Sequence, residues 1–320
     1  MTSLKTSEPG ADSALIDDLL KGAVDLHCHS GPSVMPRKLN HAEAVRQARE
    51  AGMRAVLFKD HYYSTTPVAE LLKEMISEDD VAILSGVPLN NHVGGLNPYA
   101  VEHGFKLGAK LVWMPTISAA NHIRHGHRKR LLPTRMSMME PTALTVVNDR
   151  GKIIDPVKDI LDLIAEYDGI LATGHLHISE IWPLLDEAKS RGVTRMLINH
   201  PMFLVGANLP DLTELTNMGA YLEHSICQVI DCASRHFDEN DLDAFIKAGS
   251  VAKTILGSDL GQSKNPLPVE GFREVIRMCL NLGYGEADIR RMVGLNACEL
   301  AGIVPAVVPA AKSHPQQAAQ

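Results

Sequence analysis

The 320-residue sequence lacks the features that mark secreted, membrane-spanning or nucleic-acid-binding proteins. Its five cysteines are odd in number and form no Cys-x-x-Cys pair, so we expect a reducing, cytoplasmic location. Residues 1–17 have no apolar signal core, and no run approaches the ~20 apolar residues of a membrane span. The net charge of -7 gives no reason to expect nucleic acid or an anionic membrane as a partner.

The sequence also has no Gly-x-Gly-x-x-Gly after its first predicted strand, which argues against a doubly wound dinucleotide-binding sheet. Eight short β-branched or apolar runs alternate instead with amphipathic stretches. The predicted strands are 23–28, 54–59, 81–87, 110–114, 169–173, 194–199, 220–223 and 254–257. The predicted helices are 40–51, 67–77, 98–107, 156–167, 179–191, 211–218, 240–248 and 269–282. Eight βα units in sequence predict an α/β fold, a (β/α)8 TIM barrel.

A single barrel domain is expected over residues 18–303, between a flexible N-terminal segment at 1–17 and a flexible tail at 304–320. Strand four is followed by a long insertion at about 116–155, where a barrel loop would have few residues. The insertion contains a basic run at 121–130 and a predicted hairpin that turns at 148–151. The basic run either captures an anionic substrate group or forms a solvated or subunit-contacting loop. A homo-oligomer is expected.

The first predicted strand ends in two histidines, His27 and His29, spaced by one residue. Side chains alternate along a strand, so both imidazoles point to the same side, about 7 Å apart. That spacing suits one metal ion, but it is also compatible with a histidine pair that alternates by chance. Cys28 lies between them on the opposite face, where a buried small apolar residue is expected.

The carboxyl ends of four other predicted strands carry residue types that bind metals. They are Lys59, Asp60 and His61 after strand two, His175 and His177 after strand five, His200 after strand six and Asp259 after strand eight. In a closed barrel these ends meet at one mouth, so the side chains can reach one centre. Together they predict a metal centre far more strongly than any of them does alone.

With these motifs the chain resembles the amidohydrolase superfamily of metal-dependent (β/α)8 barrels. The resemblance rests on Asp25-Leu26-His27-Cys28-His29, Gly174-His175, Asn199-His200-Pro201, Gly257-Ser258-Asp259 and the run from Gly294 to Gly302. It implies that His27, His29 and Asp259 hold a buried metal ion and that His175 and His200 hold a more exposed one. It also implies that Asp259 is catalytic, taking a proton from a metal-activated water and passing it to the leaving group.

The chain departs from the superfamily pattern at strand four, which offers neither the lysine nor the glutamate that bridges two ions in binuclear members. Lys59 on strand two is the one well-placed lysine. A carboxylated Lys59 would supply the bridge, whereas an unmodified Lys59 would pair with Asp60 or a substrate carboxylate. The cofactor is therefore one or two divalent ions. Zinc is the expected metal, with manganese, iron and nickel as alternatives.

Substrate-binding residues are predicted by location alone. The candidates are His61, His92, His122, Arg124, His177 and His224, with Arg128 beside them in the insertion. His61, His92 and His177 could equally support the ligands, and His61 is the reserve candidate for a ligand. The partner is expected to be a small molecule, with an anionic group as one option.

The predicted function is metal-dependent hydrolysis of an amide, cyclic amide, lactone or related ester. One alternative is a mononuclear decarboxylase or hydratase of a small carboxylic acid. A second is a phosphoesterase, because Lys59-Asp60-His61 resembles the strand-two motif of histidinol-phosphatase-like barrels, although no acidic ligand follows strand three. A non-enzymatic metal-binding barrel is the remaining option.

Overall fold

The computed structural model describes residues 9–76, 81–126, 134 and 136–306. The flexible tail expected at 304–320 lies outside the described residues from position 307 onward, as do the first eight residues of the expected N-terminal segment.

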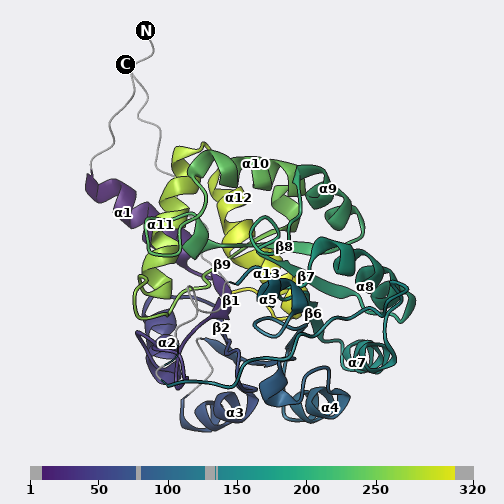
Figure 1. Cartoon of the computed structure of the whole chain (residues 1–320). Helices are drawn as coiled ribbons and strands as arrows, with labels where there is room; N and C mark the ends of the chain where they lie inside the picture. Colours follow the sequence, from purple (N-terminus) through teal and green to yellow (C-terminus); the bar gives the residue numbers. More distant parts are fainter. Residues whose placement is uncertain (1–8, 77–80, 127–133, 135, 307–320) are drawn as a thin grey trace, which may run out of the picture.

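Parallel strands form the centre of the fold, and helices surround them (Figure 1). The strands are β1 (Val24–Cys28), β2 (Ala55–Phe58), β3 (Ala82–Leu84), β4 (Gly86–Pro88), β5 (Leu111–Trp113), β6 (Ile170–Ala172), β7 (Arg195–Asn199), β8 (Tyr221–Ser225) and β9 (Thr254–Gly257). They pair in the orders β1-β2-β3 and β4-β5-β6-β7-β8-β9. Only Ser85 separates β3 from β4, so these two strands are halves of the third barrel strand.

The last strand returns to the first and completes the ring. Leu260 forms a parallel bridge with Cys28 and accepts a hydrogen bond from the backbone N–H of His29 at 2.8 Å. The backbone N–H of Asp259 donates to the carbonyl of His27 at 2.9 Å. The predicted (β/α)8 barrel is therefore confirmed, and its closure brings the residue after β9 directly against the end of β1.

Each of the eight barrel strands, with β3 and β4 counted as one, is followed by a helix on the outside of the barrel. The principal helices are α2 (His41–Glu50), α3 (Thr66–Met75), α4 (Pro98–Lys106), α7 (Asp155–Glu166), α8 (Ile178–Ser190), α9 (Leu209–Asn217), α10 (Glu239–Gly249) and α11 (Pro268–Asn281). Asn40 begins α2 with a capping box, in which its side chain accepts from the Glu43 N–H and the Glu43 carboxylate accepts from the Asn40 N–H. Short 3-10 turns lie at Asn91–Val93, Ile226–Gln228 and Val251–Lys253.

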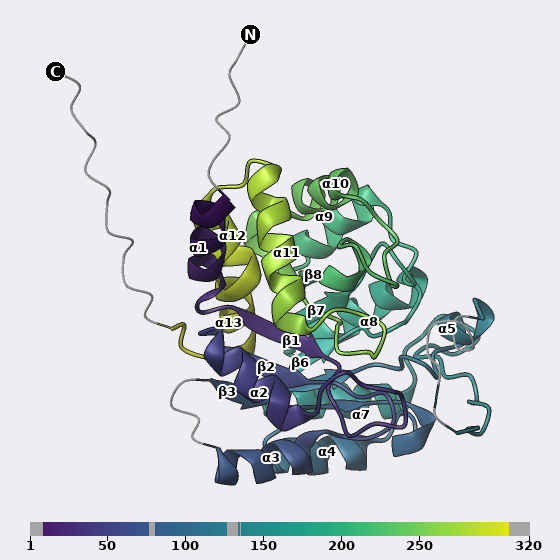
Figure 2. The same cartoon turned by 90° about the vertical axis from the view of Figure 1, so that its left-hand side faces the viewer.

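The amino end of the barrel is covered by the C-terminal helices. These are α12 (Glu286–Arg290), a π-helical turn at Arg291–Leu295 and α13 (Asn296–Ala301). Buried residues of α13 pack against the inward-facing apolar side chains of the strands, among them Val24, Leu57 and Ile255. Figure 2 shows α13 and the insertion helix α5 (Ala120–Arg124) at opposite ends of the molecule. One end is therefore filled by apolar side chains, and the other is left for the site.

Residues Pro9–Leu20 form helix α1, although the sequence led us to expect a flexible segment up to residue 17. Ile16, Leu19 and Leu20 are buried and belong to the apolar layer that also contains α11 and α12. This spacing of three and four residues places them on one face of a helix, which docks on the barrel.

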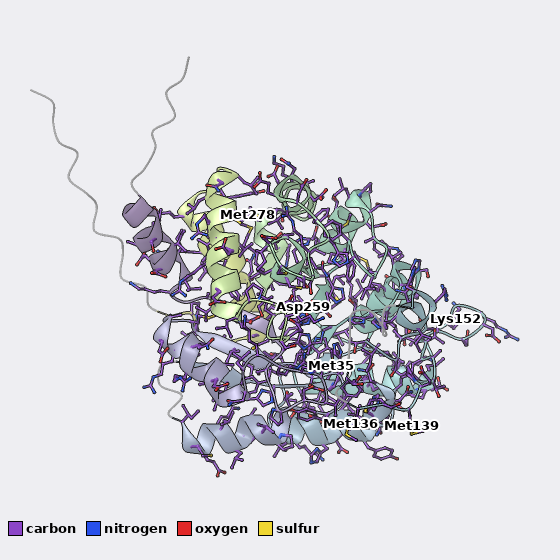
Figure 3. All side chains as sticks on the ribbon, turned by 60° about the vertical axis from the view of Figure 1, so that its left-hand side comes forward. Met35, Met136, Met139, Lys152, Asp259 and Met278 are labelled. Atoms are coloured by element: carbon purple, nitrogen blue, oxygen red, sulfur yellow. The ribbon has the colours of Figure 1, made fainter. Side chains whose placement is uncertain are left out.

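The insertion after β5 has the predicted hairpin. Val147 and Ile153 form an antiparallel bridge, and the Gly151 N–H donates to the Asn148 carbonyl at 2.8 Å to close the turn. Figure 3 shows Lys152 at the outer tip of this hairpin, far from Asp259 near the middle of the molecule. Positions 127–130 of the basic run, including Arg128, lie outside the described residues.

Among the helices that are described, none has the length and apolar character to cross a membrane.

Candidate metal centre

The predicted histidine pair ends β1 at an irregularity of the strand. The register with β2 shifts between Asp25 and Cys28, and bulges of this kind re-aim side chains beside active sites. His27 and His29 face the same side, with ring centroids 5.2 Å apart, whereas Cys28 packs in the outer apolar layer. The Asp25 carboxylate fixes the turn of the chain by accepting from the N–H groups of His27 and Ser258, both at 3.0 Å.

His27 is held from behind by a buried carboxylate on β8. Nδ1 of His27 lies 2.8 Å from Oε2 of Glu223, and Asn199 donates to the same oxygen at 2.5 Å. Burial alone would raise the pKa of Glu223, but its contacts with His27 and Asn199 and the nearby Lys59 hold it below its usual value. With Nδ1 donating to Glu223, the lone pair of His27 Nε2 points into the barrel mouth.

Asp259 meets both histidines. Its Oδ1 lies 3.0 Å from Nε2 of His29 and 3.3 Å from Nε2 of His27, and the three groups offer donor atoms within 4.8 Å of one another. Burial opposes ionisation of Asp259, yet its pKa is held well below the usual value by His27, His29 and Lys59. Its backbone is left-handed, at φ 48°, a conformation that costs energy and is concentrated at functional sites.

Lys59 lies inside this group, fully buried at the end of β2. Its Nζ donates to Nε2 of His27 at 2.7 Å and sits 5.3 Å from the Trp113 ring centroid. Burial lowers the pKa of Lys59 to about 8, although the carboxylates of Asp259 and Glu223 oppose the shift. About a tenth of this amine is therefore uncharged at pH 7.

Three more imidazoles complete a ring around the mouth of the barrel. Ring centroids are 5.1 Å apart between His29 and His61, 5.8 Å between His61 and His175, and 5.0 Å between His175 and His200. The His61 ring is oriented by a contact of 2.9 Å between its Nδ1 and the Thr116 hydroxyl. Burial lowers the pKa of His29 to about 3 and that of His200 to about 4, and it holds the pKa values of His61 and His175 well below the usual value. All four are neutral bases at neutral pH, the form that binds a metal.

The insertion contributes directly to this ring. Nδ1 of His122 on α5 lies 2.8 Å from Nδ1 of His175, and the two rings stack at 4.8 Å. The neighbouring Asn121 donates to the carbonyls of His175 and Leu204 at 3.1 and 2.7 Å. The first part of the insertion is therefore a support for His175.

Of the other predicted substrate-binding residues, the structure brings four to places outside the cavity. The His92 ring meets the Tyr62 ring edge to face, and Arg124 is exposed at the end of α5. His177 is the N-cap of α8, where its ring accepts from the Ser179 N–H. His224 points out of the barrel and stacks on Phe245, because it follows the inward-facing Glu223 on a strand whose side chains alternate. None of the four is among the described residues that line the cavity, and their role in substrate binding stays a prediction.

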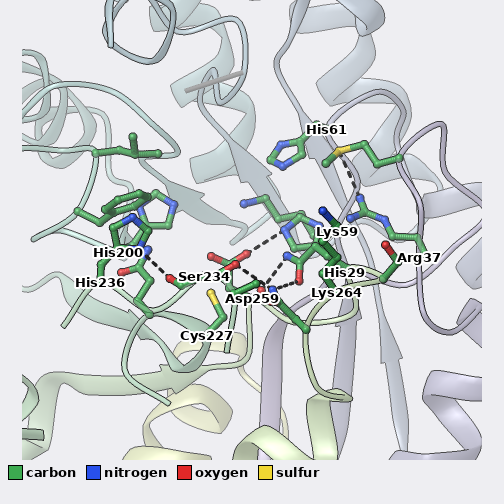
Figure 4. Close-up of a pocket in the computed structure, with 18 of the residues that line it drawn as sticks. His29, Arg37, Lys59, His61, His200, Cys227, Ser234, His236, Asp259 and Lys264 are labelled. Carbon is green, nitrogen blue, oxygen red and sulfur yellow. Dashed lines mark hydrogen bonds and ion pairs between the residues drawn. The ribbon is translucent and has the colours of Figure 1, made fainter. Parts of the chain in front are cut away.

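Two residues of the site were missed from the sequence. Glu223 could have been found from alternation, since Tyr221, Glu223 and Ser225 share one face of β8. Arg37 lies in the long loop after β1, where no periodicity predicts which side chain turns inward. It lines the same cavity as His29, Lys59 and Asp259 (Figure 4).

The chemistry of these donors fits a divalent ion. His27 directs a lone pair inward, His29 and Asp259 converge on the same point, and Nδ1 of His200 is buried with no hydrogen-bond partner within the described part of the chain. Neutral imidazoles and an ionised carboxylate are the ligands that zinc and related metals prefer. The fold and geometry therefore define a candidate metal site at the mouth of a (β/α)8 barrel.

Comparison with known proteins places the chain in a family. It belongs to the family described as "Family of unknown function (DUF6282)", which matches residues 22–223. No curated protein matches the sequence. The structure is similar to an amidohydrolase from Pseudomonas aeruginosa at a TM-score of 0.61 and 12% identity, covering 91% of this chain and 98% of that one.

Two further solved structures share the fold. A probable dipeptidase, PvdM, from Pseudomonas aeruginosa is similar at a TM-score of 0.62 and 8% identity, covering 92% of this chain and 98% of that one. A 2,6-dihydroxybenzoate decarboxylase, solved with 2,6-dihydroxybenzoate, is similar at a TM-score of 0.54 and 10% identity, covering 88% of this chain and all of the other. The fold expected from the resemblance to the amidohydrolase superfamily is therefore confirmed.

Proposed function

We propose that this chain is a metal-dependent hydrolase that opens an amide, cyclic amide, lactone or related ester bond of a small molecule. The observation that carries the proposal is the convergence of His27, His29 and Asp259 on one point, with Glu223 orienting His27 from behind. A carboxylate behind a metal-binding histidine fixes its tautomer and raises its basicity. His175 and His200 face the same cavity and are the proposed ligands of a second ion. Zinc suits this set of imidazoles and carboxylate best.

A divalent ion held by these residues would lower the pKa of a bound water to near neutrality and polarise a substrate carbonyl. Asp259 is the proposed general base. Its carboxylate stays ionised because His27, His29 and Lys59 surround it, so it can take the proton of the attacking water and deliver it to the leaving group. The His122 contact keeps the His175 ring in place while this happens.

A second candidate is a mononuclear decarboxylase or hydratase of a small carboxylic acid. The residues after β5 are Met114, Pro115 and Thr116, none of which can bridge two ions, so a second ion depends on Lys59. One structure with the same fold is a decarboxylase, which supports keeping this candidate. The two functions differ in product. A hydrolase cleaves an amide or ester bond, whereas a decarboxylase releases carbon dioxide and a hydratase adds water.

The test is a metal analysis combined with turnover of a panel of amides, lactones, esters and aromatic acids by the zinc-loaded protein. We expect hydrolysis of at least one amide, lactone or ester, and a loss of about a hundredfold or more in kcat for Asp259→Asn, the scale of a general base. Asp231→Asn, at an exposed carboxylate in the loop after β8, is the matched control and should keep full activity. Carbon dioxide release without hydrolysis would favour the second candidate. Bound metal with no turnover of any compound would overturn both.

The oligomeric state and the location of the protein stay predictions. We expect a homo-oligomer in the cytoplasm, which size-exclusion chromatography and cell fractionation would test.

A further inference from the structure

Arg37 is a buried cation beside the candidate metal centre whose hydrogen-bonding capacity is mostly unused. Its side chain is only 4% exposed. Nη2 pairs with Oδ2 of Asp60 at 3.2 Å and contacts the Met35 sulfur at 3.9 Å. Nε and Nη1 are buried and have no hydrogen-bond partner among the residues that the structure describes. Buried guanidinium donors without an acceptor are costly, so their presence calls for an explanation.

The Arg37 side chain is held rigidly in this position. Its backbone forms an antiparallel bridge with Gln262, and the flanking N–H groups of Lys38 and Ser263 donate to Gly261 and Pro36 across the same pair of loops. The Asp60 carboxylate that pairs with Arg37 is itself fixed, because it accepts from the Tyr62 N–H at 2.8 Å. The loop after β1 is thereby tied to the loop that carries Asp259, and the guanidinium is preorganised against the cavity wall.

Among the described residues that line the cavity, cations outnumber carboxylates, and the carboxylates of Asp60 and Glu223 lie behind this wall. Arg37, Lys59 and Lys264 line the cavity, whereas Asp259 is the one acid among the described lining residues. Figure 4 shows the Arg37 side chain pointing toward Lys59. Asp60 takes up only Nη2 of Arg37, so Nε and Nη1 are left to bind an anion in the cavity, whether Lys59 is an amine or a carbamate.

The remaining lining favours an organic anion. Met35, Pro36, Phe203 and Leu204 form an apolar part of the wall, which a hydrated inorganic ion would not contact favourably. Arginine donors match the planar geometry of a carboxylate better than a lysine does. We propose that Arg37 binds the carboxylate of a small organic acid with an apolar body, and that the substrate of the metal centre belongs to this class. The statement that this acid is the substrate rests on the proposed function, whereas the carboxylate-binding site at Arg37 does not.

The experiment compares carboxylates with their neutral amides. Binding of benzoate and benzamide, and of acetate and acetamide, is measured by calorimetry on the zinc-loaded protein and again after removal of metal by chelation. The wild-type protein should bind benzoate and discriminate against benzamide. Arg37→Gln should weaken benzoate binding by about tenfold or more and leave benzamide binding unchanged, because only the charge-assisted contact is lost. Lys264→Gln, at an exposed cation of the same cavity, is the matched control and should change benzoate binding less than the Arg37 variant does.

Arg37→Gln leaves Asp60 buried without its cation and could unfold the loop, so the double variant Arg37→Gln/Asp60→Asn removes both charges together. Loss of benzoate discrimination in the folded double variant supports the inference. Wild-type discrimination in that variant overturns it, and so does a wild-type protein that distinguishes no acid from its amide. If the carbamate of Lys59 were the anion that Arg37 serves, benzoate affinity would not depend on Arg37, which also overturns the inference. A protein that binds benzoate through Arg37, but retains no metal and converts no compound of the panel, would contradict the proposed function. The anion site at Arg37 would still be supported.

Discussion

Oε2 of Glu223 lies 2.8 Å from Nδ1 of His27, and both side chains are almost fully buried. The pair joins β8 to β1 across the barrel interior. It also determines which nitrogen of His27 faces the cavity, because a ring that donates to Glu223 through Nδ1 has its lone pair on Nε2. The carboxylate therefore prepares His27 as a base directed at the point where His29 and Asp259 meet.

Replacing Glu223 by glutamine should weaken metal binding. A glutamine can still contact His27 but carries no charge, so the imidazole becomes a poorer ligand and its tautomer is less firmly fixed. We expect an apparent zinc affinity lower by about tenfold or more, as is usual for such supporting carboxylates. Competition with a chromogenic chelator measures the change. Glu214→Gln, at an exposed position on α9, serves as control. Equal affinities in the wild-type protein and both variants would show that Glu223 has no role in the centre.

Gly257 leaves room for the carboxylate of Glu223. A Cβ built on this glycine would overlap Oε1 of Glu223 and lie 2.9 Å from its Cδ. Since Glu223 is fixed by His27 and Asn199, it cannot move aside without losing those contacts. We expect Gly257→Ala to destabilise the protein by about 1–3 kcal/mol, the usual cost of overpacking, and to lower its zinc content. Chemical unfolding and metal analysis measure both effects. Gly285→Ala, where the nearest atom is 4.0 Å from the added Cβ, should leave both unchanged.

The sequence predicted most of this architecture because the strands have a clear period and end in recognisable residues. His27, His29, Lys59, His175, His200 and Asp259 all reach the barrel mouth, as expected for residues at the carboxyl ends of strands. On β8 the alternation of side chains decides which of two neighbouring residues faces the centre. His224 was chosen as a candidate from β8, whereas its neighbour Glu223 faces the centre.

Loop residues were beyond this kind of reasoning. The position of Arg37 depends on backbone pairing between the loops after β1 and β9, which are far apart in sequence. Neither loop has a repeating pattern from which their contact could be inferred. His122 was a candidate by its location, but its contact with His175 depends on how α5 folds back over the barrel and could not be inferred.

His224 should make the stability of the protein depend on pH. Burial lowers its pKa from 6.5 to about 4, so the unfolded chain binds a proton between these pH values that the folded protein does not. Its stabilising contribution is complete above pH 6.5 and is lost as the pH falls toward 4. We expect His224→Leu to reduce the acid-induced fall in the free energy of unfolding of the metal-free protein by on the order of 3 kcal/mol. Urea unfolding at several pH values measures this. His103→Leu, at an exposed position on α4, should keep the wild-type slope. An unchanged slope in the His224 variant would mean that its imidazole is protonated equally in both states.

We expect Lys59 to decide how many ions the centre holds. As an ammonium, Lys59 donates to Nε2 of His27 at 2.7 Å and so occupies the lone pair that a metal ion would bind. Metal binding at His27 therefore requires Lys59 to lose its proton or to move. Burial lowers its pKa to about 8, which leaves a nucleophilic amine available near neutral pH. We expect this amine to add carbon dioxide and release a proton, forming a carbamate whose two oxygens can bridge a pair of ions.

The carbamate is observable directly. Protein reconstituted with zinc and ¹³C-labelled bicarbonate should show a carbamate carbon signal and contain two ions per chain. Lys59→Met should lose the signal and retain one ion, because His27, His29 and Asp259 remain. Lys253→Met is a suitable control, since Lys253 is a half-buried lysine that lies over the Tyr221 ring. It should keep both the signal and the second ion. One ion and no carbamate in the wild-type protein would mean that Lys59 acts as an amine, and the mononuclear decarboxylase or hydratase would then become the better account of the site.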